Sequence, residues 1–414
     1  MKFFKWLYPG IGVKRWVIVA AFGLGLMIVV ALSAIQTISR HNVLLASFAL
    51  AALIFGIFLV YTAIKNILRT FVRALMPPTK EDLVSLVYES RQRSFLSRGP
   101  RIVTIGGGTG LSVLLSGLKL HSSNLTAIVT VTDTGGSSGR LRDELDILPP
   151  GDIRNCLVAL AEAEPLIREL FQYRFGDGSG LKGHSFGNLF ITALSKVTGD
   201  FERAIKESSK VLAIRGRVIP STLDQVSLVA EYEDGRTIEG ETNITDHGKS
   251  IRRLSLKPAD CQATMEALEA IENAELIVMG PGSLYTSVLP NLLIKDILEK
   301  ILDSNALKIY VMNAMTQPGE TDRFSAYDHL EVLVSHTDPR IVDVCFINTQ
   351  PIPGSILAKY EEQSAYPVEL DVGKIREKGY EVLQGDMLRL DGQVRHDPEK
   401  LAKLMLNRYY QKIN

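Results

Sequence analysis

The sequence predicts an α/β protein: a doubly wound parallel sheet with a small antiparallel insertion, preceded by a two-helix transmembrane hairpin. Three observations lead to this fold class. Two long apolar segments lie near the N-terminus, and apolar β-branched runs alternate with helical patterns from residue 101 onward. Residues 225–245 instead alternate with a period of two around an Asp-Gly pair, which is typical of an antiparallel hairpin.

The two apolar segments cover residues 16–36 and 43–64, and neither contains Asp, Glu, Lys or Arg. Each has the length, about 20 residues, that crosses a hydrocarbon core. The link between them is so short that they must form a hairpin. Basic residues precede the first segment and follow the second, so the positive-inside rule places both termini and the globular part in the cytoplasm. We expect a two-pass anchor in the cell membrane, because no charge inside the spans marks a transport path.

The domain limits follow from these patterns. We expect the hairpin over 1–75, a linker over 76–100, and a globular domain over 101–414 with its β insertion at about 221–257. Strands are expected over 101–105, 125–132, 275–280, 308–313 and 342–348. Helices are expected near 109–119, 152–163, 186–198, 260–272, 290–302 and 397–411.

Composition excludes several classes of protein. The formal net charge is +0, so the chain lacks the basic excess that a nucleic-acid binder needs, and we expect no nucleic acid as a partner. The three cysteines are far apart and form no C-x-x-C pair, which argues against a disulfide framework and a zinc site. His184 has no partner at metal-ligand spacing, so no metal is expected, although Asp133, Asp143 and Asp146 leave a relocated metal as an alternative.

A glycine-rich loop follows the first expected strand in "RIVTIGGGTGLSVLL". Gly107, Gly108, Thr109 and Gly110 open a helix there, where backbone N–H groups can bind an anion. The loop is not a Walker A motif, since no Gly-Lys-Ser/Thr follows, and Leu111 replaces the third glycine of the dinucleotide fingerprint. By itself, the glycine run could be only a tight turn.

A second loop, "TDTGGSSGR", follows the next strand. Asp133 lies where mononucleotide-binding folds place an acid that accepts hydrogen bonds from a ribose, although a helix cap is the alternative. Gly135, Gly136 and Ser137 would form a second nest of amides, and Arg140 would balance a diphosphate.

A third loop, "GPGSLYTSV", repeats the arrangement with Gly280, Gly282 and Ser283, and Tyr285 could cover a base or a sugar. In "GHSFGNL", Asn188 is expected to face the ligand. Asp152, at the start of another helix, could line the same cleft or only cap its helix. Loops that follow parallel strands meet at one edge of the sheet, so we expect a cleft there for a phosphorylated ligand, a nucleoside diphosphate by preference.

Taken together, these loops make the chain resemble the bacterial gluconeogenesis factor family and, more distantly, the 2-phospho-L-lactate transferases. The resemblance covers nearly all of residues 101–410 but not the hairpin. It rests on the strings "IGGGTGLSVLLSGLK", "VTDTGGSSGRLRDELDILPPGDIRNCLVALA", "GHSFGNL", "GPGSLYTSVLPNLL" and "NAMTQPGET".

The resemblance implies a Rossmann-like protein that binds UDP-sugars, notably UDP-N-acetylglucosamine. It also implies support of cell shape and cell-wall precursor supply during growth on gluconeogenic carbon. Thr109 and Asp133 would contact the nucleotide, and Tyr360 and Arg395 would hold the sugar or diphosphate end. The roles of Tyr360 and Arg395 come from the resemblance alone.

The transferases carry an acidic pair suited to a divalent metal where this chain reads Gly135 to Ser138. We therefore expect a ligand-binding sensor or regulator that meets an enzyme of hexosamine or cell-wall synthesis. The alternative is a transferase that acts on a UDP-sugar or another phosphorylated substrate. No cofactor is certain, and NAD(P) stays open as a ligand, since it also presents ribose and diphosphate. Assembly into a homo-oligomer is expected for such a fold.

Overall fold

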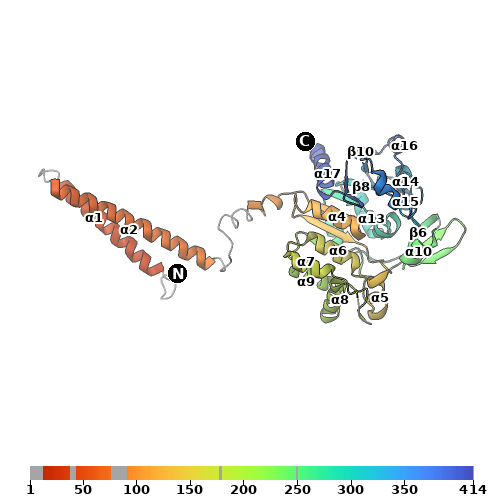
Figure 1. The fold of residues 1–414 in the computed structure, drawn as a ribbon, viewed down its shortest axis with the longest axis horizontal. Helices are drawn as coiled ribbons and strands as arrows, with labels where there is room; N and C mark the ends of the chain where they lie inside the picture. The colour runs from red at the N-terminus through yellow and green to blue at the C-terminus, as the bar shows by residue number, and fades with distance from the viewer. Residues whose placement is uncertain are drawn as a thin grey trace. The chain divides into compact units, whose positions relative to one another are not determined.

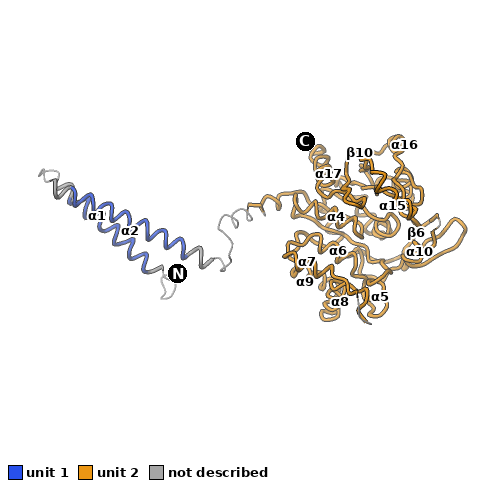
Figure 2. The backbone as a smooth tube through the Cα atoms, in the orientation of Figure 1, with its two compact units in different colours: residues 1–89 blue, residues 90–414 orange. Residues whose placement is uncertain are grey.

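The structure, a computed structural model, describes residues 13–37, 43–75, 91–92, 94–176, 180–248 and 250–413. The chain divides into two compact units, Met1–Glu89 and Ser90–Asn414 (Figure 2). Most of the expected linker, residues 76–90 and 93, lies outside the described residues, as does the turn at 38–42.

Unit 1 consists of two helices, α1 (Val13–Thr37) and α2 (Val43–Leu75), which pack side by side (Figure 1). The segments Arg15–Ser33 and Ser47–Thr70 have mean hydropathies of 2.5 and 2.3, so both are long and apolar enough to cross a membrane. The helices meet at small residues: a Cβ atom on Gly23 would lie 3.0 Å from the Gly56 carbonyl oxygen. Such small contact residues let two apolar helices approach closely.

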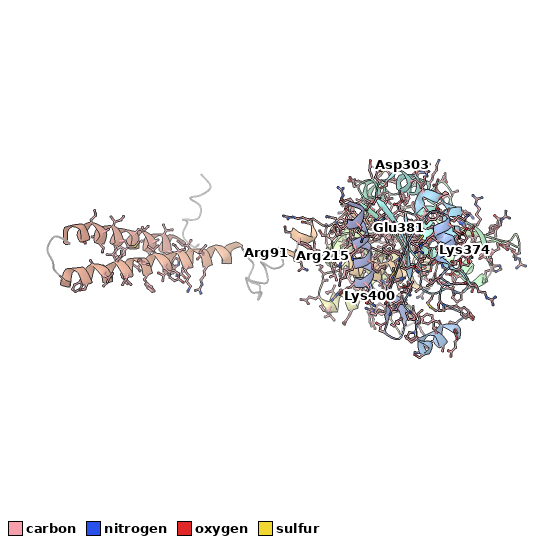
Figure 3. All side chains as sticks on the ribbon, turned by 90° about the horizontal axis from the view of Figure 1, so that it is seen from above. Arg91, Arg215, Asp303, Lys374, Glu381 and Lys400 are labelled. Atoms are coloured by element: carbon pink, nitrogen blue, oxygen red, sulfur yellow. The ribbon has the colours of Figure 1, made fainter. Side chains whose placement is uncertain are left out.

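The side chains of unit 1 are mainly apolar and turned outward, with only 11% of each apolar segment buried. Phe22 and Phe48, for example, are 65% and 75% exposed. In contrast, the charged residues labelled in Figure 3 all belong to unit 2. A water-soluble protein rarely exposes a continuous apolar surface of this kind.

Unit 2 is built on a seven-stranded sheet in the order β10-β9-β8-β7-β1-β2-β3, in which every neighbouring pair is parallel. The strands are β1 (Ile102–Gly106), β2 (Leu125–Val129), β3 (Arg217–Pro220), β7 (Leu276–Met279), β8 (Leu307–Val311), β9 (Val344–Asn348) and β10 (Glu381–Gly385). The predicted α/β fold with a parallel sheet is confirmed.

The order of the strands reverses between β1 and β7. From β1 the chain winds outward through β2 and β3, and from β7 it winds the other way through β8, β9 and β10. Because parallel crossovers are right-handed, the helices that follow the two halves cover opposite faces of the sheet. The crevice at such a reversal, beyond the carboxyl ends of the strands, is where open α/β sheets bind their ligands.

Helices connect the strands (Figure 1). Those between β1 and β3 are α4 (Gly108–Leu118), α5 (Gly136–Leu145), α6 (Gly151–Leu160), α7 (Pro165–Gln172), α8 (Phe186–Thr198) and α9 (Phe201–Val211). Those from the insertion onward are α10 (Glu241–His247), α11 (Met265–Glu272), η3 (Leu284–Val288), α12 (Leu289–Leu292), α13 (Lys295–Asp303), α14 (Ala326–His336), η4 (Pro339–Ile341), α15 (Gly354–Glu361), α16 (Val372–Glu377) and α17 (Pro398–Ile413). α4 packs between α6 and α17.

The antiparallel insertion is present as β4 (Ser227–Tyr232), β5 (Thr237–Glu239) and β6 (Ile251–Lys257), with β4 in the centre. A second small hairpin, β11 (Leu388–Leu390) with β12 (Val394–His396), was not predicted. Its strands have only three residues each, too few for a readable alternation. The residues after Asp133, which were expected to form a loop, form the helix α5 from Gly136 onward. Their backbone amides therefore belong to a helix and not to a loop.

Candidate functional site

A cleft of about 540 Å³ opens at the carboxyl ends of β1 and β7, where the strand order reverses. Segments far apart in the sequence form its walls: the loops after β1, β2, β7 and β8, the start of α6 and of α10, and the C-terminal part of unit 2. The lining residues are Gly107, Gly108, Thr109, Gly110, Val113, Asp133, Asp152, Glu241, Pro281, Gly282, Ser283, Thr286, Ser287, Asn313, Ala314, Met315, Thr316, Gln317, Pro318, Tyr360, Gln363, Ala365, Val394, Arg395 and His396.

The N-terminus of α4 points into the cleft. Its cap residue, Gly107, offers no side chain, so the first amides of the helix depend on other partners. The Gly108 amide donates to the Asp152 carboxylate, which leaves the amides of Thr109 and Gly110 facing the cavity without an intrahelical acceptor. The helix dipole adds partial positive charge at this point. This wall is therefore suited to an anion.

Glycine is required where α4 passes the loop after β7. A Cβ atom on Gly110 would lie 2.5 Å from the Pro281 carbonyl oxygen. Gly108 has a φ of +66°, a conformation that side chains disfavour. The glycines of "GGGTG" thus allow two backbones to approach closely and also leave room for an anion.

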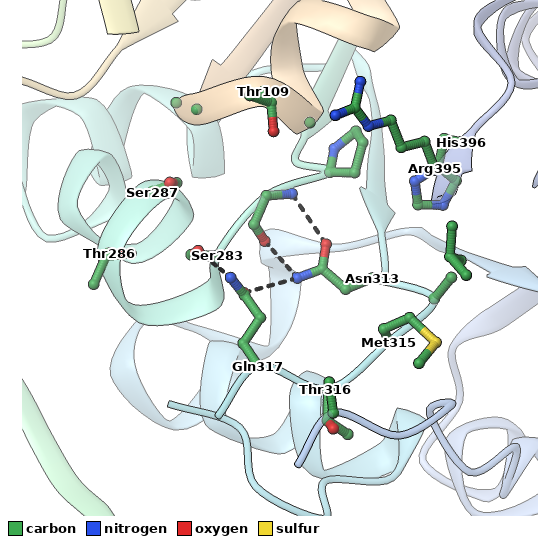
Figure 4. Close-up of a pocket in the computed structure, with 18 of the residues that line it drawn as sticks. Thr109, Ser283, Thr286, Ser287, Asn313, Met315, Thr316, Gln317, Arg395 and His396 are labelled. Carbon is green, nitrogen blue, oxygen red and sulfur yellow. Dashed lines mark hydrogen bonds between the residues drawn. The ribbon is translucent and has the colours of Figure 1, made fainter. Parts of the chain in front are cut away.

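The loops after β7 and β8 are hydrogen-bonded to each other (Figure 4). Asn313 accepts from the Gly282 amide at 3.2 Å and donates to the Gly282 carbonyl at 2.9 Å. Gln317 donates to the Ser283 hydroxyl at 2.7 Å and accepts from Asn313 at 3.2 Å. Because the chain itself uses the Gly282 amide, the third loop contributes a rigid wall and the Ser283 hydroxyl, but not the bare amides that were expected.

Tyr360 and Arg395 line the wall that the C-terminal part of unit 2 supplies. The Tyr360 hydroxyl accepts a hydrogen bond from the Val394 amide at 2.8 Å, which attaches α15 to the β11–β12 hairpin. Arg395 follows directly and extends over the cavity toward the side of Thr109 (Figure 4). Among the described residues, its guanidinium has no ion-pair or hydrogen-bond partner within the chain.

Three carboxylates, Asp133, Asp152 and Glu241, lie at another part of the cleft. Burial, together with the neighbouring charges of Asp133 and Asp152, raises the pKa of Glu241 to about 8. Burial and the Asp133 charge also raise the pKa of Asp152 to about 6. Within the described ranges, no group of three or more His, Cys, Asp or Glu side chains is arranged to hold a metal ion. The carboxylates repel one another and would be stabilised by hydroxyl donors or by protons.

Several of the expected ligand residues do not line the cleft. Arg140 donates to the Lys182 carbonyl at 2.8 Å, which directs its side chain elsewhere. Asn188 donates to Ser137 at 3.1 Å, and Ser137 is also 3.0 Å from His184, so these side chains contact one another in the interior, where the Asn188 Oδ1 atom has no hydrogen-bond partner among the described residues. The remaining residues outside the lining are Gly135, Gly136 and Gly280.

The glycines among these residues have structural roles. The Gly135 amide donates to the Asp133 side chain at 2.8 Å as α5 begins, and Gly280 donates to the Ile105 carbonyl to continue the sheet. The prediction for Tyr285 was wrong. Its ring is fully buried against Phe324 and His336 and cannot cover a base. Asp152, left open between two roles, lines the cleft and binds the α4 amide rather than capping its own helix.

Sequence reasoning missed Glu241, His396 and the side chains of the loop after β8. Glu241 lies at the start of a seven-residue helix in the insertion and reaches the Thr134 amide at 3.2 Å. No local pattern marks such a contact between distant segments. The Asn313 and Gln317 pair follows a predicted strand, which is the signal that could have identified it.

The raised pKa of Glu241 makes stability depend on pH in a defined direction. The pKa of the Glu241 carboxyl is about 4.5 in the unfolded state and about 8 in the folded state. The contribution of this group to stability is therefore fully present below about pH 4.5 and is lost as the pH rises through about 8. We expect Glu241→Gln to be increasingly more stable than the wild type over that range. Calorimetric melting temperatures of the full chain in detergent micelles measure the difference. Glu233→Gln, an exposed change in the same insertion, is the control, and parallel profiles for all three proteins would contradict the expectation.

Comparison with known proteins agrees with this architecture. The family model of the 2-phospho-L-lactate transferase CofD matches residues 102–388, a range that includes Tyr360 but ends before Arg395. A crystal structure of a UPF0052-family protein from Bacillus halodurans superimposes with a TM-score of 0.73 at 48% identity, covering 75% of this chain and 99% of that chain.

The similar sequences differ in how much of the chain they match. The gluconeogenesis factor of Bacillus subtilis is 48% identical over 313 residues, 75% of this chain and 99% of its own length. A relative from Nostoc sp. (strain PCC 7120) is 45% identical over 426 residues, 99% of this chain and 93% of its own. The match to Nostoc thus includes the apolar helices. With this level of identity over most of its length, the chain belongs to the gluconeogenesis factor (UPF0052) family.

Proposed function

We propose that the cleft binds a UDP-sugar such as UDP-N-acetylglucosamine, with the diphosphate between the N-terminus of α4 and Arg395. The observation that carries the proposal is the pairing of an uncapped helix N-terminus with an arginine that has no partner in the described chain, on the walls of one cavity. Both groups are suited to a doubly charged phosphate, because one supplies oriented amides and the other a bidentate guanidinium.

The distribution of charge sets the orientation of the ligand in the cleft. A diphosphate is repelled by Asp133, Asp152 and Glu241, whereas the hydroxyls of a ribose can donate to them. The sugar then extends toward the wall formed by Tyr360 and the loop after β8. A volume of about 540 Å³ lies within the range of small-ligand sites and accommodates a molecule of this size.

We favour binding without turnover, so that the protein acts as a sensor of wall-precursor supply. Relatives from Bacillus subtilis and Halalkalibacterium halodurans carry the name gluconeogenesis factor, which supports a role in cells that grow on gluconeogenic carbon. The ligand would connect the loops around the cleft with the C-terminal wall that carries Arg395. The surface formed by those loops would then meet an enzyme of hexosamine or cell-wall synthesis, and cell shape would depend on the contact.

The two apolar helices support attachment of this unit to the cell membrane. Their length, their exposed apolar side chains and the basic residues at the outer ends of the pair favour a two-pass hairpin with both termini in the cytoplasm.

A transferase is the second candidate, and the three carboxylates favour it. Asp152, with a pKa of about 6, and Glu241, with a pKa of about 8, titrate near neutral pH, as groups that exchange protons with a substrate must do. The family match to a transferase that handles a phosphorylated substrate points the same way.

Removing Arg395 tests the binding site. We expect Arg395→Ala to weaken UDP-N-acetylglucosamine by about tenfold to a hundredfold, the effect of losing a charge-assisted hydrogen bond. Tyr360→Phe should weaken it by a smaller factor, because the hairpin loses its hydrogen bond to α15. Titration calorimetry of the full chain in detergent micelles measures both.

Arg376→Ala is the matched control, since it removes the same charge from an exposed residue of α16 outside the cleft. An equal loss in Arg376→Ala and Arg395→Ala would remove the support for the proposed site. Competition with NAD and NADP in the same titrations decides between the nucleotide classes, and displacement by NAD at lower concentration would favour the dinucleotide.

Turnover separates the sensor from the transferase. When the full chain is incubated with UDP-N-acetylglucosamine and a heat-treated membrane extract, the sensor leaves the nucleotide sugar intact, as measured by chromatography. Release of many equivalents of UDP per protein, beyond the release in the extract alone, would establish the transferase. In that case Asp133→Asn should reduce turnover much more than binding, whereas in a sensor it reduces binding.

Membrane attachment predicts that the full chain stays in the membrane fraction after a carbonate wash, and that a chain without residues 1–75 does not. His41→Cys should react with a membrane-impermeant maleimide from outside the cell, because the turn faces outward in this topology. The three native cysteines are buried and provide little background. Full-length protein in the soluble fraction, or labelling only after lysis, would overturn the topology.

A further inference from the structure

A second cavity, of about 470 Å³, lies along the outer face of α4 and is walled by α6 and α7. We call it the α4 groove. Its floor consists of residues spaced along one face of the helix: Thr109, Ser112, Val113, Ser116 and Lys119. Neither the sequence patterns nor the proposed UDP-sugar site makes use of this cavity.

The α4 groove is continuous with the cleft. Thr109, Val113 and Arg395 line both cavities, so that the first turn of α4 and one guanidinium separate them. A molecule in the groove would therefore lie next to the atoms that we assign to the diphosphate. Ligands that occupied both cavities at once would lie on either side of Arg395.

The charged residues that line the groove are mainly basic. Lys119, Arg168 and Arg395 oppose a single acid, Glu169. Lys119 donates to the Ala161 carbonyl at 2.8 Å, and besides burial it is the charge of Arg168 that lowers its pKa. The two cations thus repel each other across a partly buried surface. An anion between them would relieve this repulsion.

Arg168 has no partner within the described part of the chain. Its Nε atom is buried without a hydrogen-bond acceptor, and its guanidinium forms no ion pair with any described carboxylate. Leaving a buried donor unsatisfied is costly, so such a group usually has a partner that the free chain does not supply. A phosphate or carboxylate oxygen would satisfy it.

We propose that the α4 groove binds a small organic anion, a phosphate monoester or a carboxylate, beside the ligand of the cleft. Arg168 and Lys119 hold the anionic group, while Val113, Val158 and Ala159 contact the body of the molecule. The size of the cavity favours a metabolite over a peptide segment or a lipid surface. This site goes beyond the proposed UDP-sugar binding and does not require it.

Three probes built on a six-carbon sugar, which are glucose, gluconate and glucose 6-phosphate, test the chemistry, and inorganic phosphate tests the anionic group alone. Melting temperatures of the full chain in detergent micelles are measured at constant ionic strength. We expect glucose 6-phosphate, gluconate or both to stabilise the wild type, and glucose to have no effect. Arg168→Gln should weaken the effective probe by about tenfold. Stabilisation by glucose equal to that by glucose 6-phosphate would overturn the proposal.

Arg203→Gln is the matched control, because it removes one exposed positive charge on α9, outside the groove. Equal weakening of the probe in Arg168→Gln and Arg203→Gln would reduce the effect to net charge and overturn the site. Ser116→Phe fills the groove without changing charge and should also abolish the stabilisation. If it leaves probe binding unchanged, the probe does not occupy the groove.

UDP-N-acetylglucosamine binding, measured in parallel, keeps this proposal distinct from the proposed function. Arg168 does not line the cleft, so Arg168→Gln should bind the nucleotide sugar as the wild type does. A chain that binds the phosphate probe through Arg168 but no nucleotide sugar would support the groove and contradict the cleft. A chain that binds the nucleotide sugar but shows no binding of the phosphate probe through Arg168 would support the cleft and contradict the groove.

Discussion

The close contact between the N-terminus of α4 and the loop after β7 is the constraint on which the cleft depends. Two adjacent parallel strands bring these segments together, and the backbones approach so closely that Gly110 has no room for a Cβ atom beside the Pro281 carbonyl. The helix can therefore direct its amides into the crevice instead of into the opposite loop. Any side chain at this position would separate the two halves of the sheet at the point where the ligand is proposed to lie.

The remaining walls are held rigid by polar side chains that serve the chain itself. Asn313 and Gln317 fasten the loop after β8 to the loop after β7. Glu320, whose pKa burial raises to about 7, accepts a hydrogen bond from Thr286 at 3.2 Å and from the amides that begin η3. Among the described lining residues, the groups that keep unused hydrogen-bonding capacity include the α4 amides, the Arg395 guanidinium and the buried Nε2 atom of His396. Preorganisation of this kind reduces the entropy that a ligand must lose on binding.

The central strands could be predicted from the sequence because both faces of a parallel sheet are buried, so β1, β2, β7, β8 and β9 read as continuous apolar runs. The edge strands β3 and β10 were not predicted: β3 has four residues and ends in a proline, and none of the residues of β10 is fully buried. At the site, the glycine-rich loop and Asp133 follow parallel strands, and loops after such strands meet at one edge of the sheet. This rule alone placed both in the cleft. Glu241 could not be placed, since its position depends on how the insertion packs on the loop after β2. The Gly282 amide was expected to be free for a ligand, but it donates to Asn313. That hydrogen bond could not be predicted, because Asn313 lies 31 positions away in the sequence.

The hydrogen bond between Tyr360 and Val394 also bears on how the protein is made. It joins two segments from the last part of the chain, and together they supply one entire wall of the cleft. During translation the apolar helices leave the ribosome first, and the glycine-rich loop follows long before Arg395. A nascent chain can thus pair its central strands while the cleft still lacks one wall. The proposed ligand site is complete only after the segment that carries Arg395 has been made and folded onto the rest.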